Sequence, residues 1–130
     1  MSHQVPARRV MLVDDDPDIR FIAEIALARI GGFEVAMAAS VEAAREQLAD
    51  RPLPDALLLD VTMPITDGPT FLQELRSDAG FDALPVVFMT ARTGLEDIQT
   101  FVAMGAAGVV SKPFDPMTLP DDVRGILEPR

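Results

Sequence analysis

The sequence contains no cysteine, and its 130 residues include one histidine, His3. Without cysteine the chain can form no disulfide, no thiolate metal site and no thiol nucleophile. A single histidine in a ragged N-terminal segment offers neither a zinc ligand set nor an imidazole for catalysis. Disulfide scaffolds, zinc proteins and thiol- or histidine-dependent enzymes are therefore not expected.

Basic residues and long apolar runs are also scarce. The net charge is −10, and no basic stripe is present that would bind a phosphate backbone, so nucleic acid is not an expected partner. No apolar run approaches the roughly 20 residues that a membrane-spanning helix needs. The start of the chain leads into only a short apolar stretch before three aspartates, which does not resemble a secretory signal. A cytoplasmic protein without a membrane partner is expected.

The length predicts one domain. Apolar residues make up 48% of the chain and are spread along all of it, which favours a single compact core. Residues 1–8 are expected to be a flexible N-terminal segment and residues 9–130 the domain itself. A fused output module is not expected at this length.

Short apolar runs alternate with segments of helical periodicity five times along the chain. Strands are predicted at 9–13, 33–38, 56–59, 86–89 and 109–111, and helices at 17–30, 41–50, 68–77 and 95–104, with a last helix from near Pro116 or Leu119. Gly31 and Gly32 are expected to end the first helix, and Ser40 to cap the second. The alternation predicts an α/β fold, a doubly wound five-stranded parallel sheet of the flavodoxin-like (βα)5 type. Its strand order would be 2-1-3-4-5, although periodicity alone does not prove that order.

Polar side chains stand at the end of four of the predicted strands. These residues are Asp14, Asp15, Asp16, Asp60, Thr90, Ser111 and Lys112. The carboxyl ends of parallel strands form the ligand-binding edge, where three clustered carboxylates would need a cation. Oxygen donors suit Mg²⁺, or Mn²⁺, better than zinc or copper. With Lys112 able to reach an anion or a carboxylate, and a hydroxyl from Thr90, the pattern indicates phosphoryl transfer.

The motifs at these positions resemble the receiver domains of two-component response regulators, including the single-domain chemotaxis type. The resemblance covers about residues 9–127 and rests on Val13-Asp14-Asp15-Asp16, Leu59-Asp60-Val61-Thr62-Met63-Pro64, Asp67-Gly68, Met89-Thr90-Ala91 and Ser111-Lys112-Pro113-Phe114. Each motif is weak alone, but their order and separations together are specific. The glycine of the third motif is expected to relieve backbone constraint near a helix start.

The resemblance implies a set of metal ligands. Asp60 would be the phosphorylated residue and would share the ion with Asp15. Asp14 would hold the ion mainly through water, and Thr62 would offer its backbone carbonyl. Asp16 corresponds to a variable position and is expected to face solvent.

The resemblance also implies the groups that bind the phosphoryl oxygens. Thr90 and the Ala91 amide would donate hydrogen bonds to them, and Lys112 would pair with the phosphoryl group. The peptide between Lys112 and Pro113 is expected to be cis. The catalytic set consists of Asp60, Thr90 and Lys112. The protein would catalyse only its own phosphorylation and dephosphorylation.

The implied function is a phosphorylation-dependent switch. A sensor histidine kinase or a histidine phosphotransfer protein would phosphorylate Asp60, and an unknown downstream protein would read the result. One departure from the family is Val109, where an aromatic switch residue is usual, so output would have to travel differently, through Met89, Phe101 or the backbone. The alternatives are a relay that passes phosphate to another histidine, a binding module that is not phosphorylated, and an aspartate-nucleophile phosphatase. The phosphatase is disfavoured because Thr62 stands where its second aspartate belongs.

Overall fold

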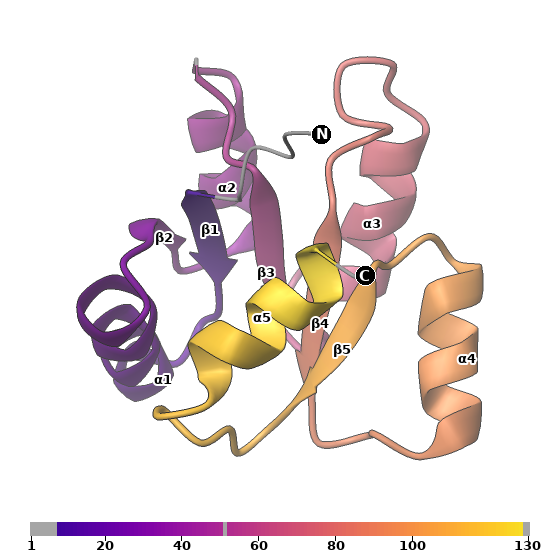
Figure 1. Cartoon of the computed structure of the whole chain (residues 1–130). Helices are drawn as coiled ribbons and strands as arrows, with labels where there is room; N and C mark the ends of the chain where they lie inside the picture. Colours follow the sequence, from indigo (N-terminus) through magenta and orange to yellow (C-terminus); the bar gives the residue numbers. More distant parts are fainter. Residues whose placement is uncertain (1–7, 51, 129–130) are drawn as a thin grey trace, which may run out of the picture.

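The computed structural model describes residues 8–50 and 52–128 and has a parallel five-stranded sheet at its centre (Figure 1). The strands are β1 (Arg9–Val13), β2 (Glu34–Ala38), β3 (Ala56–Asp60), β4 (Val86–Thr90) and β5 (Gly108–Ser111). Their order is β2-β1-β3-β4-β5, and every neighbouring pair is parallel. The predicted flavodoxin-like fold and strand order are confirmed.

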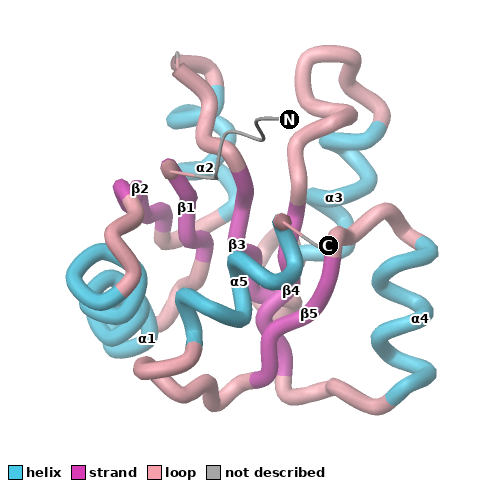
Figure 2. The backbone as a smooth tube through the Cα atoms, viewed as in Figure 1, coloured by secondary structure: helices cyan, strands magenta, loops and turns pink. Residues whose placement is uncertain are grey.

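Helices cover both faces of the sheet (Figure 2). They are α1 (Pro17–Glu24), which continues into the π-helix η1 (Ile25–Ile30), then α2 (Val41–Leu48), α3 (Gly68–Arg76), α4 (Leu95–Ala103) and α5 (Leu119–Leu127). One apolar core lies between the sheet and α2, α3 and α4, and a second lies between the sheet and α1, η1 and α5. The sheet is therefore the middle layer of three.

Strand β3 is buried along its whole length, as its run of apolar residues predicts. Leu57 and Leu59 point into the core under α2, α3 and α4, whereas Leu58 points into the opposite core. Two-sided burial leaves no solvent-facing position in the strand, so Asp60 at its end is the first polar group that the strand offers. Because β3 is the central strand, that carboxylate lies in the middle of the sheet edge.

The first helix differs from its prediction. Ala23, Ala26 and Leu27 are buried as its periodicity predicts, but Ile22 is 41% exposed and Ile30 is 46% exposed. The π-helical turn explains Ile30, because a hydrogen bond such as the one from the Gly31 amide to the Ala26 carbonyl, 3.0 Å, widens the turn and changes the spacing of the core face. The simple 3.6-residue period therefore fails at this end of the helix.

The other bounds move by one or two residues. Helix α2 ends at Leu48 and not at residue 50, α3 and α4 each end one residue early, β2 begins one residue late, β3 and β4 each extend one residue further, and β5 begins one residue earlier. The Ser40 side chain caps α2 by accepting from the Ala43 amide, 3.0 Å, as predicted. His3 and the rest of residues 1–7 of the expected flexible segment lie outside the described residues. Among the described residues no helix is long and apolar enough to cross a bilayer.

Gly68 begins α3 directly behind the end of β3. A Cβ atom on this residue would lie 2.5 Å from the Asp60 carbonyl oxygen and 3.1 Å from the Phe88 ring. Its φ is not positive, so the glycine does not serve the backbone freedom expected from the sequence. It is needed because α3 packs closer to the backbone of Asp60 than any side chain allows.

We therefore expect Gly68→Ala to destabilise the protein by about 2 kcal/mol, because the added methyl group meets backbone that cannot yield. Gly125→Ala is the matched control, because a Cβ at this exposed position in α5 meets nothing within 4 Å. It should stabilise the protein by about 1 kcal/mol, the usual gain for alanine over glycine in a helix. Urea unfolding followed by circular dichroism measures both; equal effects of the two substitutions would contradict the close-approach explanation.

Candidate functional site

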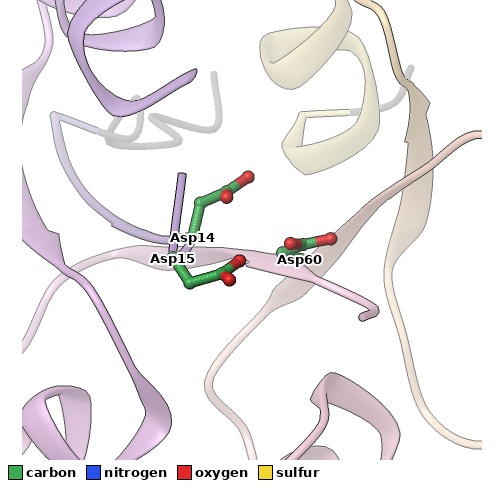
Figure 3. A group of neighbouring side chains, drawn as sticks. All are labelled: Asp14, Asp15 and Asp60. Atoms are coloured by element: carbon green, nitrogen blue, oxygen red, sulfur yellow. The ribbon is translucent and has the colours of Figure 1, made fainter. Parts of the chain in front are cut away.

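Three carboxylates meet at the carboxyl ends of the central strands. Asp14 and Asp15 follow β1, and Asp60 is the last residue of β3. One oxygen from each lies within 4.8 Å of the others, and Figure 3 shows the three side chains gathered at one place. The cluster predicted from the two acidic motifs therefore exists in the fold.

Asp14 is completely buried, and protein donors occupy both of its oxygens. Its Oδ1 accepts from the Asp16 amide, 2.9 Å, and its Oδ2 accepts from the Lys112 Nζ, 2.8 Å. A buried carboxylate is costly unless it is paired and hydrogen-bonded in this way. Asp14 is therefore an anchored group at the back of the site, whereas Asp15 is exposed at the front.

Asp60 lies between opposing electrostatic influences. Its side chain is 8% exposed, and its Oδ1 is 3.4 Å from the Lys112 Nζ and accepts from the Thr62 amide at 3.3 Å. Burial, and next the negative charge of Asp14, raise the pKa of Asp60 above its ordinary value of 3.8, although Lys112 and the Thr62 amide act to lower it. The carboxylate is thus held in a state that an added positive charge would stabilise.

Lys112 joins the last strand to the acidic cluster. Its ammonium group lies between the carboxylates of Asp14 and Asp60. The sequence left open whether Lys112 contacts an incoming anion or a carboxylate, and in this structure it contacts carboxylates. Burial alone would lower the pKa of Lys112, but the hydrogen bond and charge of Asp14, together with Asp60, raise it above 10.5. The lysine therefore stays charged. The Lys112–Pro113 peptide is cis, as expected.

Thr90 completes the edge from β4. Its side chain is buried, and its Oγ1 accepts a hydrogen bond from the Arg92 amide, 3.0 Å, which leaves the hydroxyl hydrogen free for another acceptor. Ala91 and Thr62, on the loops that follow β4 and β3, are exposed. All seven residues named for the site, Asp14, Asp15, Asp60, Thr62, Thr90, Ala91 and Lys112, thus lie at or just beyond the carboxyl ends of β1, β3, β4 and β5.

The donor set fits a hard divalent cation. The three carboxylates supply only oxygen, and Asp15 presents its carboxylate to solvent. Such sites favour Mg²⁺, Mn²⁺ or Ca²⁺ over metals that prefer nitrogen or sulfur ligands. The geometry therefore gives an acidic pocket that could hold a metal ion next to a fixed ammonium group.

Comparison with known proteins shows the family to which the chain belongs. Residues 10–124 match the family model of the response regulator receiver domain. The chain belongs to this family. Its fold and its sequence are those of a receiver domain of two-component response regulators, and the phosphatase alternative is not favoured.

Individual relatives of this receiver domain include one solved chain that it covers almost completely and longer proteins that it covers in part. The chemotaxis response regulator CheY4 of Vibrio cholerae superposes with a TM-score of 0.82 at 31% identity, over 92% of this chain and 98% of that one. The response regulator Rre1 of Synechocystis is 42% identical over 91% of this chain and 51% of its own length. The transcriptional regulatory protein PrrA of Mycobacterium tuberculosis is 37% identical over all of this chain and 54% of its own length. The chain thus spans about half the length of the curated relatives it matches.

Val109 of the receiver domain lies beside a pair of aromatic rings. It pairs with Phe88 in the sheet and packs half-buried against the core that contains Phe101. The Phe88 and Phe101 rings are 5.0 Å apart, which links β4 to α4. Met89 is buried in the opposite core. The sequence suggested three routes for output, Met89, Phe101 and the backbone. Of the two side chains, Met89 belongs to β4 itself, whereas Phe101 connects β4 to α4 through its contact with Phe88.

Two residues support the receiver site that sequence reasoning did not assign to it. The Arg20 guanidinium donates to the Asp14 carbonyl oxygen, 2.8 Å, and the exposed Asp16 caps α1 by accepting from the Asp18 amide, 2.9 Å. A contact from Arg20 to the acidic run could have been expected from the sequence, because Arg20 is a basic residue one turn into the helix that follows that run. The cap explains why an acidic residue stands at Asp16 without a ligand role.

The raised pKa of Asp60 predicts that this residue destabilises the metal-free protein. Because the pKa is raised, folding favours the neutral form of the Asp60 carboxyl group. Below about pH 4 the group is neutral in both states and carries no penalty, and its destabilising effect on the folded protein develops as the pH rises through the folded-state pKa. Asp60→Asn should therefore raise stability at pH 7 by about 1 kcal/mol, and this gain should disappear in acid. Urea unfolding at both pH values, without added metal, measures it.

Asp67→Asn is the control for this experiment. Asp67 caps α3 by accepting from the Thr70 amide, 2.9 Å, and asparagine caps equally well, so little change is expected. A lower stability of Asp60→Asn at pH 7 would show that the Lys112 interaction outweighs burial and repulsion.

Proposed function

We propose that this receiver domain accepts a phosphoryl group on Asp60 from a phosphohistidine of a sensor histidine kinase or of a histidine phosphotransfer protein. The observation that carries the proposal is the position of Asp60, a buried carboxylate that shares Lys112 with Asp14 at the middle of the sheet edge. A carboxylate held in this way can act as a nucleophile once a bound cation stabilises its ionised form.

The transfer forms one bond and breaks one. An Asp60 carboxylate oxygen bonds to phosphorus, and the phosphorus–nitrogen bond of the phosphohistidine breaks, with its electron pair returning to the imidazole. The product is an acyl phosphate on the receiver and an unmodified histidine on the donor. Positioning and charge neutralisation supply most of the catalysis in such transfers, so the site needs no further catalytic group beyond those that position and neutralise the phosphoryl group.

Mg²⁺, with Mn²⁺ as a substitute, is the proposed ion. Asp15, Asp60 and the Thr62 backbone carbonyl would hold it directly, and its charge would offset that of the carboxylates and of the phosphoryl oxygens. Asp14 would hold it mainly through water, as the family resemblance implies, while its two oxygens also accept from the Asp16 amide and from Lys112.

The phosphoryl oxygens would meet groups from the last two strands. Lys112 is close enough to Asp60 to pair with an added phosphoryl group, and Thr90 has a hydroxyl hydrogen to donate. The Ala91 amide would donate a third hydrogen bond. Phosphorylation adds nearly two negative charges and three acceptor oxygens, so these groups would be drawn inward.

The proposed consequence is a switch in affinity for a protein partner. Movement at Thr90 would bias an existing equilibrium at α4 through Phe88 and Phe101, and thereby change the face that a downstream protein reads. Passing the phosphoryl group to another histidine, as a relay, uses the same site. We propose a cytoplasmic setting and protein partners, without nucleic acid or membrane contact by this domain.

Labelling with a small phosphodonor tests the function. With Mg²⁺ the protein should take up one acid-stable, base-labile phosphoryl group per chain, and Asp60→Ala should take up none. Asp50→Ala, which removes an exposed carboxylate two residues beyond the end of α2, should label fully. Continuous turnover of many phosphomonoesters, or labelling that survives loss of Asp60, would overturn the proposal.

The lifetime of the acyl phosphate should depend on Arg92. This residue lies two positions beyond Thr90, and its guanidinium pairs with Asp97 at 2.9 Å. Arg92→Glu replaces that pair by repulsion and places a carboxylate beside the route of water to the phosphoryl group, so the decay rate should change at least about threefold. Decay of the labelled protein after removal of the phosphodonor measures it; equal rates in both proteins would exclude the role.

A further inference from the structure

The loop between Asp60 and α3 is closed at its base. The Gly68 amide donates to the Val61 carbonyl, 3.0 Å, and the Val61 amide donates to the Met89 carbonyl, 3.2 Å. The intervening residues 62–67 therefore form a projecting loop, and its first residue, Thr62, is a proposed metal ligand that also donates to Asp60. Any movement of this loop reaches the site through Thr62.

The tip of the loop is a strained turn. The Thr66 amide donates to the Pro64 carbonyl, 2.9 Å, around Ile65, whose φ is 71°. A three-residue turn with positive φ at its centre is the rare form of the γ-turn, and a β-branched residue is poorly suited to it. Ile65 is 95% exposed, so packing of its own side chain does not hold it there. Neighbouring residues must keep the turn closed.

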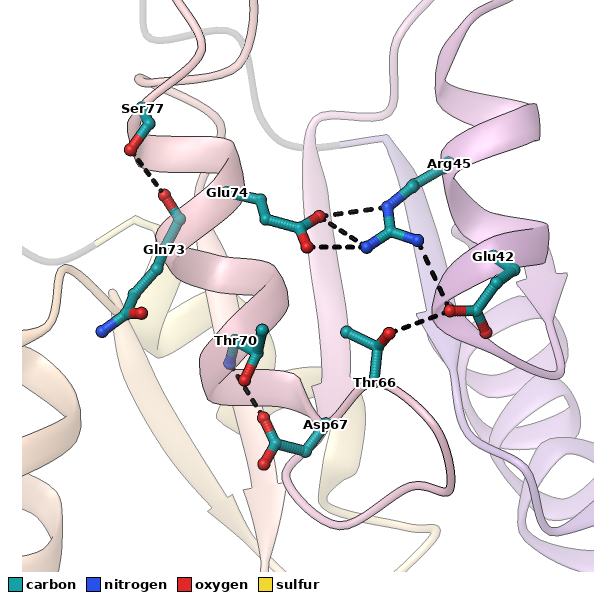
Figure 4. Close-up of polar contacts among 8 residues, drawn as sticks. All are labelled: Glu42, Arg45, Thr66, Asp67, Thr70, Gln73, Glu74 and Ser77. Atoms are coloured by element: carbon teal, nitrogen blue, oxygen red, sulfur yellow. Dashed lines mark hydrogen bonds and ion pairs between the residues drawn. The ribbon is translucent and has the colours of Figure 1, made fainter.

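A polar network on α2 and α3 holds the loop at Thr66 (Figure 4). The Thr66 hydroxyl donates to Glu42 Oε2, 2.9 Å, and Arg45 donates to the same oxygen at 3.4 Å. Arg45 also donates to Glu74 through Nε, at 3.0 Å, and through Nη2, at 2.7 Å to each carboxylate oxygen. Two helices thus fix the Glu42 carboxylate, and that carboxylate fixes the residue next to the strained turn.

The network is more ordered than a single surface ion pair. Its charged groups are each about 41 to 44% exposed, so the individual attractions are weakened by water. Geometry compensates, because Arg45 engages Glu74 through two nitrogens and lies 5.7 Å from the Phe71 ring. Hydrogen bonds from its own backbone and from Thr66 lower the pKa of Glu42, which therefore remains ionised at neutral pH.

We infer that Thr66 and Glu42 are positioning residues of the receiver site, which hold the strained loop after Asp60 in the conformation that places Thr62 for the divalent cation. The inference rests on the proposed function and names a part of the site outside its ligands. When the hydrogen bond from Thr66 to Glu42 is absent, the turn at Ile65 opens in part of the population. The apparent affinity for the ion then falls by the fraction of molecules that keep the competent loop.

Mg²⁺ titration of the full chain tests the inference. Thr66→Val removes the hydroxyl and keeps the shape, and a hydrogen bond of this kind changes an equilibrium constant by about fivefold. The dissociation constant for Mg²⁺ should therefore rise by more than twofold and at most about fivefold, while the unfolding temperature of the metal-free protein changes little. Calorimetry and the amide NMR signal of Thr62 are suitable readouts, since the chain has no tryptophan or tyrosine.

Three further variants make the result specific. Thr66→Ser keeps the hydroxyl and should restore binding to within about twofold of the wild type. Thr70→Val, the same change at an exposed threonine of α3, should have no effect. Glu42→Ala should raise the dissociation constant as Thr66→Val does, and the double variant should raise it no further, because both act through one contact.

The outcomes separate this inference from the proposed function. If wild-type protein binds Mg²⁺ and Thr66→Val binds it equally well, or if Thr66→Ser fails to restore binding, the positioning role is wrong and the function stands. If wild-type protein neither binds Mg²⁺ nor takes up a phosphoryl group, the function itself is overturned, and the inference with it.

Discussion

The buried ion pair between Asp14 and Lys112 is the constraint on which the site depends. Asp14 has no exposed surface, and Lys112 approaches it to 2.8 Å from the other end of the sequence. Burying the Asp14 carboxylate without that ammonium group would be too costly. Burying the Lys112 ammonium group without the carboxylate would be costly for the same reason. The pair fixes the ends of β1 and β5 relative to each other, and Asp60 lies within reach of the same ammonium group.

As a consequence of this arrangement, Asp60 destabilises the metal-free protein. One lysine cannot fully neutralise two neighbouring carboxylates in a mostly dry site, so Asp60 keeps a raised pKa and excess negative charge stays in the pocket. The rest of the fold compensates through burial of apolar side chains, including the four that precede Asp60 in β3. The close contact of Gly68 with the Asp60 backbone shows the same trade-off, since the site is held rigidly by packing that tolerates no added atom.

Much of this could be predicted from the sequence, because strand ends follow local rules, whereas the strand order was expected from the fold type and not from periodicity. A fully apolar run before Asp60 identifies a central strand, and polar residues after four runs identify one edge of a parallel sheet. Local rules fail where the structure departs from the common case. Isoleucine usually avoids positive φ, so the turn at Ile65 is not expected from its residue type. The π-helical turn changes the helical period, so the period of an α-helix wrongly places Ile30 in the core. The hydrogen bond from Thr66 to Glu42 joins residues 24 positions apart. No periodicity or composition signals such contacts.

The strand order has a further consequence for how the chain reaches its native state. The three strands β2, β1 and β3 come from the first half of the chain and can pair before the rest is present, since each connection is a local crossover. Asp14 nevertheless lies 98 residues from its cation, which arrives with the last strand. The ion pair between Asp14 and Lys112 therefore couples the first half of the chain to its last strand, and full compensation of the buried carboxylate needs β5 in place. Such long-range coupling is in keeping with the all-or-none unfolding expected for a domain of this size.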